Sequence, residues 1–277
     1  GGMTVRNVSL AVREIRSRRG LMTEANRLVP EEVPIAFSYG GSTHAVMMAT
    51  PDDLEDFAVG FSLAEGIIGH AREIVDIEVV EAGDGIDVQV VLVDANAEAL
   101  TSRRRRMAGP VGCGLCGIES IEQATRVVPA IADSGFALQP AQIAEAMRLL
   151  GEGQRLNRET RAVHAAGFYV PGQGVVAIRE DVGRHNALDK LAGAVLLGGW
   201  SPAEGAVVVT SRLSVEMVQK TAALGSPMLI AISAPTALAI RTAEKAGMTL
   251  IGIARDDDFE IFTGSEKVVQ GVFHHVS

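Results

Sequence analysis

The chain has two cysteines, and they stand three positions apart in a glycine-rich stretch, Gly112-Cys113-Gly114-Leu115-Cys116-Gly117. Two thiols at this C-x-x-C spacing can form a redox dithiol, half of a zinc site or a sulfur relay. The glycines allow the stretch to bend and let a partner approach the sulfur atoms closely. A helical pattern begins just after Gly117, and the free N–H groups of a helix start stabilise a thiolate. We therefore interpret Cys113 and Cys116 as reactive thiols rather than as a buried, inert pair.

A zinc site is the second interpretation of the same stretch. Zinc needs four ligands, and the chain has no second C-x-x-C, so that His164 and His185 are the only obvious extra candidates. A four-cysteine site shared by two copies of the chain stays open. We rank zinc second to sulfur chemistry and expect no tightly bound metal.

Four consecutive arginines, Arg103 to Arg106, stand a few residues upstream of the cysteines. Such a run is usually a solvated surface, because like charges repel one another. Next to reactive thiols, in a chain of net charge −9, the run can instead gather a polyanionic ligand or an acidic partner. The sequence leaves both interpretations open.

The densest polar cluster is the stretch 180–190, in which seven of eleven side chains can form hydrogen bonds. It lies between a predicted strand and a predicted helix. In one interpretation Asp181 caps the helix, while Asp189 and Lys190 are surface residues. In the other, which the dense mixture of arginine, histidine, asparagine and acidic side chains favours, the stretch forms a binding site at a strand exit.

Polar side chains also follow the predicted parallel strands of the C-terminal half, at 210–214, 233–236 and 255–258. The carboxyl ends of parallel strands meet at one edge of a sheet, and ligands bind there. Serine and threonine at these places can simply cap the next helix. With Arg212 and Arg255 on the same edge, the cluster favours a phosphate-bearing ligand.

The elements that would position these residues follow from the hydrophobic pattern. Two apolar runs around a Pro-Gly turn predict a hairpin, and the apolar strands that then alternate with helices predict a parallel sheet covered on both faces. His164 lies in the first run, where a lone histidine is more often a core residue than a ligand unless it faces the same pocket. We expect strands at 163–170, 175–180, 206–210, 228–232 and 249–253, and helices at 187–195, 215–224 and 237–246.

The front of the chain predicts a smaller α+β unit. Its strands alternate or continue in apolar residues, and Thr50 is the expected N-cap of a helix whose apolar stripe starts at Leu54. We therefore expect an α/β fold in three parts. They are an irregular N-terminal arm (1–32, with Gly1 and Gly2 as an expression scar), an α+β unit ending in the arginine-rich and C-x-x-C stretch (33–135), and an α/β domain (136–277).

Composition excludes several classes of protein. Hydrophobic residues make up 47% of the 277 residues and charged residues 21%, which is ordinary for a globular chain. The net charge of −9 disfavours a general nucleic-acid or anionic-membrane binder, because both need a basic face. The longest apolar stretch, 228–240, is too short to span a bilayer. Two cysteines exclude a disulfide scaffold, so we expect a soluble protein of a reducing compartment with no nucleic-acid or membrane partner.

Several of these motifs together resemble the formate dehydrogenase accessory sulfurtransferase (FdhD-type) family. The likeness runs in collinear order over roughly residues 30–265, and the stretch 180–190 is its most specific part. The other segments that carry it are 48–54, 61–68, 112–117, 164–166, 211–220 and 234–236.

The resemblance implies a cytoplasmic homodimer whose C-terminal half is similar to the cytidine-deaminase-like fold. It implies a sulfur carrier that takes persulfide sulfur from a cysteine desulfurase and hands it to the molybdenum bis(molybdopterin guanine dinucleotide) cofactor of formate dehydrogenase. Cys113 matches the persulfide-bearing cysteine of the family and Cys116 its C-x-x-C neighbour, while 253–258 matches a cofactor-contacting segment. Together with the polar strand ends, the residues expected to contact the cofactor are Ile253, Ala254, Arg255, Asp256, Asp257, Asp258, His164, Arg184, His185, Ser211, Arg212 and Ser214.

The chain departs from the family pattern in two places. The residues at 160–163 differ from the glycine and hydroxyl residue usual before the matched histidine, and the carboxylates at 256–258 would repel phosphates. Deamination is not expected, because Ala166 stands where the deaminase pattern needs a glutamate. The alternatives to a sulfur carrier are a zinc- or dithiol-containing chaperone for the cofactor without sulfur transfer, and a nucleotide-binding protein without sulfur chemistry.

Overall fold

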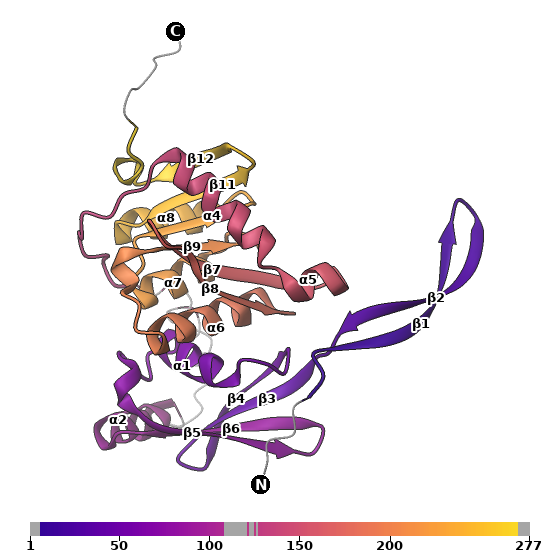
Figure 1. Ribbon diagram of the computed structural model, residues 1–277. Helices are drawn as coiled ribbons and strands as arrows, with labels where there is room; N and C mark the ends of the chain where they lie inside the picture. Colours follow the sequence, from indigo (N-terminus) through magenta and orange to yellow (C-terminus); the bar gives the residue numbers. More distant parts are fainter. Residues whose placement is uncertain (1–5, 108–120, 122–124, 126, 271–277) are drawn as a thin grey trace.

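The five predicted strands of the C-terminal half belong to one six-stranded sheet in the computed structural model, which describes residues 6–107, 121, 125 and 127–270 (Figure 1). The strand order is β12-β11-β10-β9-β7-β8. The predicted hairpin is confirmed as β7 and β8, and the predicted parallel strands as β9, β10 and β11. The strands are β7 (His164–Val170), β8 (Gly174–Asp181), β9 (Ala206–Val209), β10 (Met228–Ala231), β11 (Thr249–Arg255) and β12 (Asp258–Thr263).

Helices cover both faces of this sheet, which is why its central strands are continuously apolar. Val207 and Val209 of β9 belong to the core beneath three of the helices, whereas Ala206 and Val208 belong to a second core beneath α4. Successive residues of a strand point to opposite faces, so both sets must be apolar. The helices are α4 (Pro140–Glu152), α5 (Arg155–Thr160), α6 (Arg184–Leu197), α7 (Val215–Leu224) and α8 (Ala237–Ala246), with the short 3-10 helices η2 (Pro202–Glu204) and η3 (Ser265–Lys267).

The end of the sheet differs from the sequence prediction. The aspartates at 256–258 were expected in a loop beyond the last strand, but β11 continues to Arg255 and turns back into β12, with Arg255 opposite Asp258. Asp256 takes the left-handed conformation, φ 55°, that a tight turn requires and aspartate tolerates. The aspartates therefore form the tip of a hairpin. Its second strand was missed because all but two of its residues are polar or exposed.

The predicted front unit is a four-stranded sheet with the order β4-β3-β6-β5, and α1 packs on one of its faces. The predicted apolar stripe of α1 is confirmed, since Phe57 and Phe61 are buried with their rings 4.8 and 4.5 Å from that of Phe37. The elements are β3 (Val33–Tyr39), β4 (Ser42–Ala49), α1 (Leu54–Ala64), η1 (Ala71–Glu73), β5 (Ile74–Ala82), β6 (Gly85–Leu92) and α2 (Asp94–Met107).

The two units meet where α1 crosses α6. The backbones touch there, because a Cβ atom on Gly60 would lie 1.6 Å from the carbonyl oxygen of Asp189, and one on Gly193 would lie 1.8 Å from that of Asp56. No side chain fits at either position without a backbone shift. Two helical glycines, Gly60 and Gly193, thus allow the two units to pack this closely.

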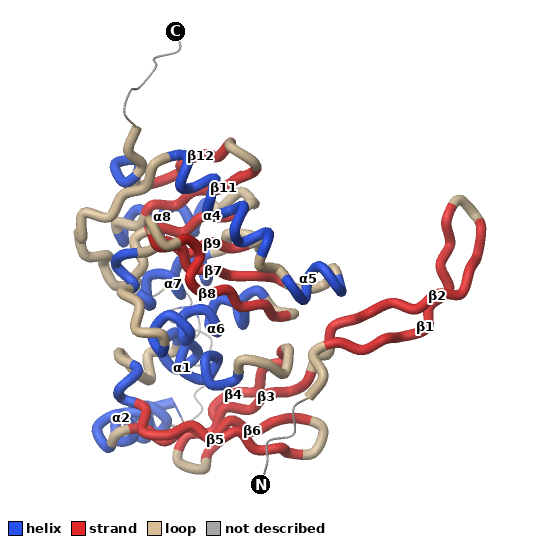
Figure 2. Tube along the Cα trace, viewed as in Figure 1, coloured by secondary structure: helices blue, strands red, loops and turns tan. Residues whose placement is uncertain are grey.

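Residues 1–32, expected to be an irregular arm, correct the sequence prediction. They contain β1 (Ser9–Arg18) and β2 (Leu21–Pro30), an antiparallel ribbon that projects from the body of the molecule (Figures 1 and 2). Arg19 and Gly20 join the strands with positive φ angles, 51° and 80°, as a two-residue hairpin turn requires. The ribbon was missed because it packs on no core and so carries no regular alternation of apolar and polar residues.

Among the described residues, no helix is both long and apolar enough to cross a membrane. The same part of the chain holds no group of three or more histidine, cysteine, aspartate or glutamate side chains that could ligate a metal ion.

Candidate functional site

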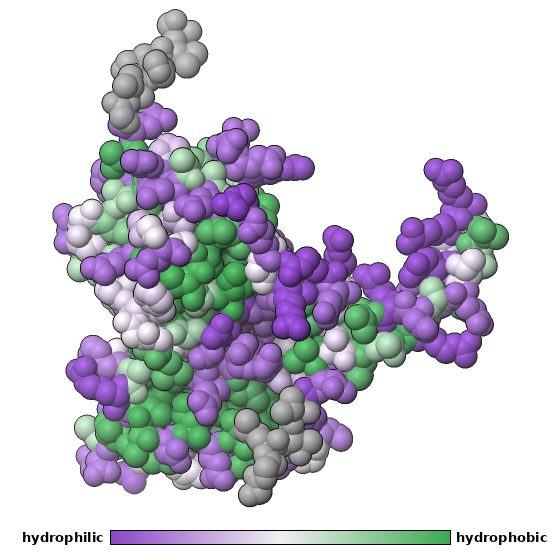
Figure 3. Space-filling model, in the orientation of Figure 1, coloured by the Kyte–Doolittle hydropathy of each residue, from purple (hydrophilic) through white to green (hydrophobic). Residues whose placement is uncertain are grey.

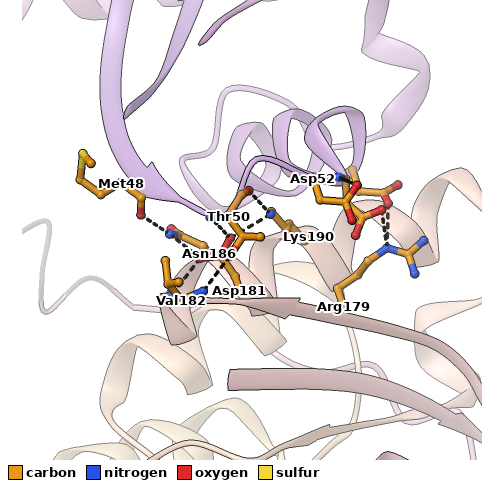
Figure 4. A network of polar contacts seen from close by, with 11 residues as sticks. Met48, Thr50, Asp52, Arg179, Asp181, Val182, Asn186 and Lys190 are labelled. Atoms are coloured by element: carbon orange, nitrogen blue, oxygen red, sulfur yellow. Dashed lines mark hydrogen bonds and ion pairs between the residues drawn. The ribbon is translucent and has the colours of Figure 1, made fainter. Parts of the chain in front are cut away.

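Asp181, Asn186 and Lys190 of the polar stretch 180–190 belong to a buried network between the two units (Figure 4). The side chains of Lys190 and Asp181 are both fully buried, with Nζ 2.8 Å from Oδ1. Lys190 Nζ also donates to the carbonyl oxygen of Thr50 at 2.9 Å and lies 5.4 Å from the centre of the Phe57 ring. Lys190 on α6 thus joins β8 to the front unit, and the interpretation of this residue as a surface lysine is wrong.

The carboxylate of Asp181 is saturated with donors. It accepts hydrogen bonds from the backbone N–H groups of Thr50 and Gly183, at 3.0 and 2.8 Å, and from Asn186 Nδ2 at 3.1 Å. Asn186 Nδ2 also donates to the carbonyl oxygen of Met48 at 2.9 Å. A buried ion pair is tolerated when its remaining hydrogen bonds are made. The network therefore has a structural role, which also corrects the expectation that Thr50 is a helix cap, since the cap of α1 is Asp53.

Asp189, the other residue expected at the surface, is buried as well. Its carboxylate accepts two hydrogen bonds from Lys220 Nζ of α7, at 2.8 and 2.9 Å. Burial raises the pKa of Asp189, and the charge of Lys220 opposes that rise. The pair ties α6 to α7, and the charge of Lys220 also contributes to the lowered pKa of His185.

Arg184 and His185 of the same stretch differ from these residues. Within the described structure, Arg184 Nε and His185 Nε2 are buried and have no hydrogen-bond partner. Both residues stand in the first turn of α6, whose N-cap is Gly183 and which has neither a side-chain cap nor an acidic residue there. Buried polar atoms are normally satisfied, so unpaired donors at an uncapped helix start indicate a place for an acceptor group such as a phosphate.

His164 lies beside this helix start. It is the first residue of β7, opposite Asp181 of β8, and β7 runs antiparallel to β9, which brings His164 to the carboxyl end of β9. Burial lowers the pKa of His164, and the charges of Arg184 and Arg212 lower it further. The structure therefore brings His164, Arg184 and Arg212 into one electrostatic neighbourhood.

Two predicted serines belong to the same edge. Ser214 is the N-cap of α7 but accepts no backbone N–H with its side chain, whereas Thr236 caps α8 in the ordinary way, accepting from Ala239 N at 3.2 Å. Ser211 is buried, and its hydroxyl makes only long contacts to Arg212 and Met217. Among the described residues the start of α6 has neither a side-chain cap nor an acidic residue, whereas the first turn of α7 contains Glu216, whose pKa is lowered chiefly by a hydrogen bond to its own backbone N–H. We name this area the strand-end rim, with members His164, Arg184, His185, Ser211, Arg212 and Ser214.

The expected segment 253–258 lies on the same edge, because β11 runs parallel to β9 with β10 between them. Two strand spacings separate their ends by roughly 10 Å. Ile253 is 41% exposed with a positive φ of 53° and donates its N–H to Ser233, while Ala254 is buried. Arg255, Asp256, Asp257 and Asp258 are exposed at the hairpin tip.

Cys113 and Cys116 lie outside the described residues. The arginine run upstream of them ends α2 and divides into two pairs. Arg103 and Arg104 donate to backbone carbonyl oxygens of the front unit, those of Glu65, Tyr39 and Ser42. Arg105 and Arg106 are exposed. Arg104 and Arg105 also line an open cavity of about 460 Å³ between α2 and the ends of β3 and β6.

Comparison with known proteins finds one family over most of the chain. The model of the FdhD/NarQ family matches residues 30–269. The chain is 66% identical over 252 residues to a sulfur carrier protein of Agrobacterium fabrum, covering 91% of this chain and 93% of the relative, and 52% identical over 268 residues to a sulfur carrier protein of Brucella abortus, covering 97% and 100%. A solved structure from Desulfotalea psychrophila, assigned as a formate dehydrogenase accessory protein, superposes with a TM-score of 0.76 at 27% identity, covering 95% of this chain and all of the other.

Proposed function

Because the chain belongs to the FdhD/NarQ family, we propose that it is a sulfur carrier that serves the maturation of formate dehydrogenase. One structural observation supports a ligand site: Arg184 Nε and His185 Nε2 are buried with no hydrogen-bond partner among the described residues, in a stretch whose other polar side chains are paired. The strand-end rim has the chemistry for phosphate groups, namely two arginines and the start of α6, which has no side-chain cap or acidic residue among the described residues.

We propose Cys113 as the residue that carries the sulfur. Its thiolate attacks the outer sulfur of a persulfide on a cysteine desulfurase, so that a new S–S bond forms on Cys113 and the donor cysteine leaves as a thiolate. No net electrons are needed in this step.

Delivery of the outer sulfur as sulfide requires two electrons. The thiolate of Cys116 supplies them when it attacks the inner sulfur of the Cys113 persulfide, which forms a Cys113–Cys116 disulfide and releases sulfide to the acceptor. A cellular thiol must then reduce the disulfide. The proposed acceptor is the molybdenum bis(molybdopterin guanine dinucleotide) of formate dehydrogenase, with its phosphates at the strand-end rim and beside the segment 253–258.

The arrangement of the larger sheet supports the finer fold description and assembly that the resemblance implies. A hairpin that leads into parallel strands with helices on both faces is compatible with a cytidine-deaminase-like fold, and we propose this fold, in a cytoplasmic homodimer. The chemistry of deaminases is not proposed. Ala166 is buried on β7 where a catalytic glutamate would be needed.

Mass spectrometry of the purified chain tests the sulfur step. After incubation with a cysteine desulfurase and cysteine, we expect the mass of one added sulfur atom on the peptide that contains Cys113, lost on reduction. The Cys116→Ala variant should still gain the sulfur, and Cys113→Ala should not. An unmodified Cys113 peptide, with the desulfurase active in the same tube, would instead support a cofactor-binding chaperone, and stoichiometric zinc in the native spectrum would support a metal site.

A further inference from the structure

The cavity beside α2 belongs to the front unit and has no part in the proposed function. It has a volume of about 460 Å³ and opens between α2 and the ends of β3 and β6, at the lower left of Figure 1. None of the residues that line it is a member of the strand-end rim. Sites for small molecules typically enclose roughly 300–1,000 Å³, so this cavity has the size of a ligand site.

The sequence of α2 explains why the protein itself does not fill this space. A helix that packs on a sheet needs large apolar side chains at positions i, i+3, i+4 and i+7 of one face. On the face of α2 that lines the cavity, these positions are Ala97, Leu100, Thr101 and Arg104. Only Leu100 is large and apolar, and it is 5% exposed. The helix therefore leaves space where other helices bury side chains.

Contacts from arginines to backbone carbonyl groups hold the end of α2 on the front unit instead. Arg103 Nη1 donates to the carbonyl oxygen of Glu65 at 2.8 Å. The two Nη atoms of Arg104 reach the carbonyl oxygens of Tyr39 and Ser42 at 3.4 and 3.3 Å, which is longer than the ~2.9 Å usual for such bonds. Tyr39, Ser42 and Arg104 all line the cavity, so this guanidinium borders it and is only weakly bonded.

The charged groups around the cavity are all positive. Among the described residues that line it, these groups are the guanidiniums of Arg104 and Arg105, and there is no carboxylate. Arg105 is exposed and has no hydrogen bond or ion pair with another described residue, whereas Arg103 lies 3.9 Å from the carboxylate of Glu65. Arginines in a last helical turn complement the helix dipole, but the dipole requires no cavity beside them. In a chain of net charge −9, this place favours an anion.

The remaining lining of the cavity is largely apolar. Tyr39, Leu92 and Leu100 are 3%, 8% and 5% exposed and form its floor, and Val91 at its wall is 51% exposed. Figure 3 shows hydrophobic residues at the surface of the front unit, in the lower part of the view, beside hydrophilic ones. An apolar floor with a few convergent polar groups at one side is the usual composition of a small-molecule site.

We propose that this cavity binds a small organic anion with an apolar body. The anionic group, a carboxylate, sulfonate or phosphate ester, accepts hydrogen bonds from Arg105 and from Arg104, for which a charged acceptor is a stronger partner than two distant carbonyl oxygens. The apolar body lies on Leu92 and Leu100 and covers Val91. An inorganic anion held by the arginines alone and an uncharged apolar molecule are the competing occupants.

Two fluorescent probes of the same shape test both halves of this proposal. They are 8-anilinonaphthalene-1-sulfonate (ANS) and N-phenyl-1-naphthylamine, which lacks the sulfonate and is otherwise the same molecule. Fluorescence titration of the full chain should show that ANS binds and that the uncharged probe binds about tenfold more weakly. Inorganic phosphate in excess should not displace ANS, because it cannot use the apolar floor. GDP should not displace ANS either, because GDP is the probe for the strand-end rim.

Two matched pairs of variants locate the bound ANS. Arg105→Leu should raise its dissociation constant about tenfold, whereas Arg106→Leu, at an exposed arginine that does not line the cavity, should change it less than about twofold. Ala97→Trp fills the mouth of the cavity and should raise the constant at least about tenfold. Ala99→Trp should leave it unchanged, because residues two positions apart on a helix do not share a face.

Thermal unfolding midpoints show whether each variant remains folded. Equal effects within either pair of variants overturn the proposal, because ANS would then bind elsewhere on the chain. Equal binding of the two probes, or displacement of ANS by phosphate, overturns the class of ligand. Displacement by GDP places the probe at the strand-end rim and leaves the cavity without a ligand.

Discussion

Two groups of polar side chains in the stretch 180–190 behave in opposite ways. Asp181 and Lys190 are fully buried, paired with each other and hydrogen-bonded to Thr50, so they hold the two units together. Arg184 and His185 stand only one turn away, with buried nitrogen atoms that nothing contacts by a hydrogen bond in the described structure. The density of polar residues in a sequence therefore does not distinguish structural side chains from candidate ligand-binding side chains. The hydrogen-bond partners of each side chain in the structure do distinguish them.

The largest effect is expected from breaking the buried pair. Lys190→Met leaves Asp181 buried without its cation, and we expect a loss of about 3–5 kcal/mol in the free energy of unfolding. Urea titration measures it. The exposed ion pair of Arg148 and Glu152 on α4 provides the control, because Arg148→Met should cost less than about 0.5 kcal/mol.

The double variant Lys190→Met with Asp181→Asn sharpens this test. Removing both charges avoids an unpaired buried ion, so stability should return part of the way to wild type. If Lys190→Met alone costs less than about 1 kcal/mol, the pair does not hold the units together.

A somewhat smaller loss is expected at the helix crossing between the units. Gly60→Ala forces the backbones of α1 and α6 apart, since the new Cβ would meet the carbonyl oxygen of Asp189, and overpacking of this kind costs about 3 kcal/mol. Gly151→Ala in α4 is the matched control, because no atom lies within 4 Å of its added Cβ. That variant should gain up to about 1 kcal/mol through helix propensity, and equal effects at the two glycines would contradict the close crossing.

The elements that could be predicted from the sequence are those whose buried faces require apolar residues at regular positions. The parallel strands and α1 were predicted because buried faces require apolar residues at fixed spacing, as in Val207 and Val209 or Phe57 and Phe61. The N-terminal ribbon and β12 were missed because most of their residues are exposed, and an exposed strand imposes no pattern.

The partners of the candidate site were beyond sequence reasoning for a different reason. The sequence singled out the stretch 180–190, but Lys190 of that stretch contacts Thr50, which is 140 positions away in the chain. No local pattern records such a contact. The same holds for His164, whose place beside Arg184 and Arg212 depends on the antiparallel pairing of β7 with β9.

At the strand-end rim we expect loss of binding without loss of stability. Arg184→Leu removes a guanidinium whose Nε has no hydrogen-bond partner in the described part of the chain, so the free energy of unfolding should change by less than about 1 kcal/mol. The affinity for GDP, a probe with the guanine nucleotide of the proposed cofactor, should fall about tenfold, which corresponds to ~1.4 kcal/mol. Calorimetric titration measures the affinity, with Arg148→Met as the folded control. Unchanged GDP affinity would remove the rim from the proposed cofactor site.

The smallest effect concerns pH, and it distinguishes the rim histidines from the buried ion pair. Burial is the main cause that lowers the pKa of both His164 and His185, so the unfolded chain binds more protons than the folded chain near and below the ordinary histidine pKa of ~6.5. The stability that comes from keeping these two histidines neutral is therefore complete above that pH. It is lost as the pH falls from there through their lowered pKa values. In the double variant His164→Asn with His185→Asn, the urea midpoint should decline less between pH 7.5 and pH 5.5 than in the wild type.

The same histidines should make GDP binding depend on pH. A phosphate group bound at the rim favours the protonated imidazoles, so GDP should bind more tightly at pH 6 than at pH 8 in the wild type, and this difference should shrink in the double variant. If the two chains show the same pH dependence in both measurements, the histidines neither titrate with folding nor face the ligand.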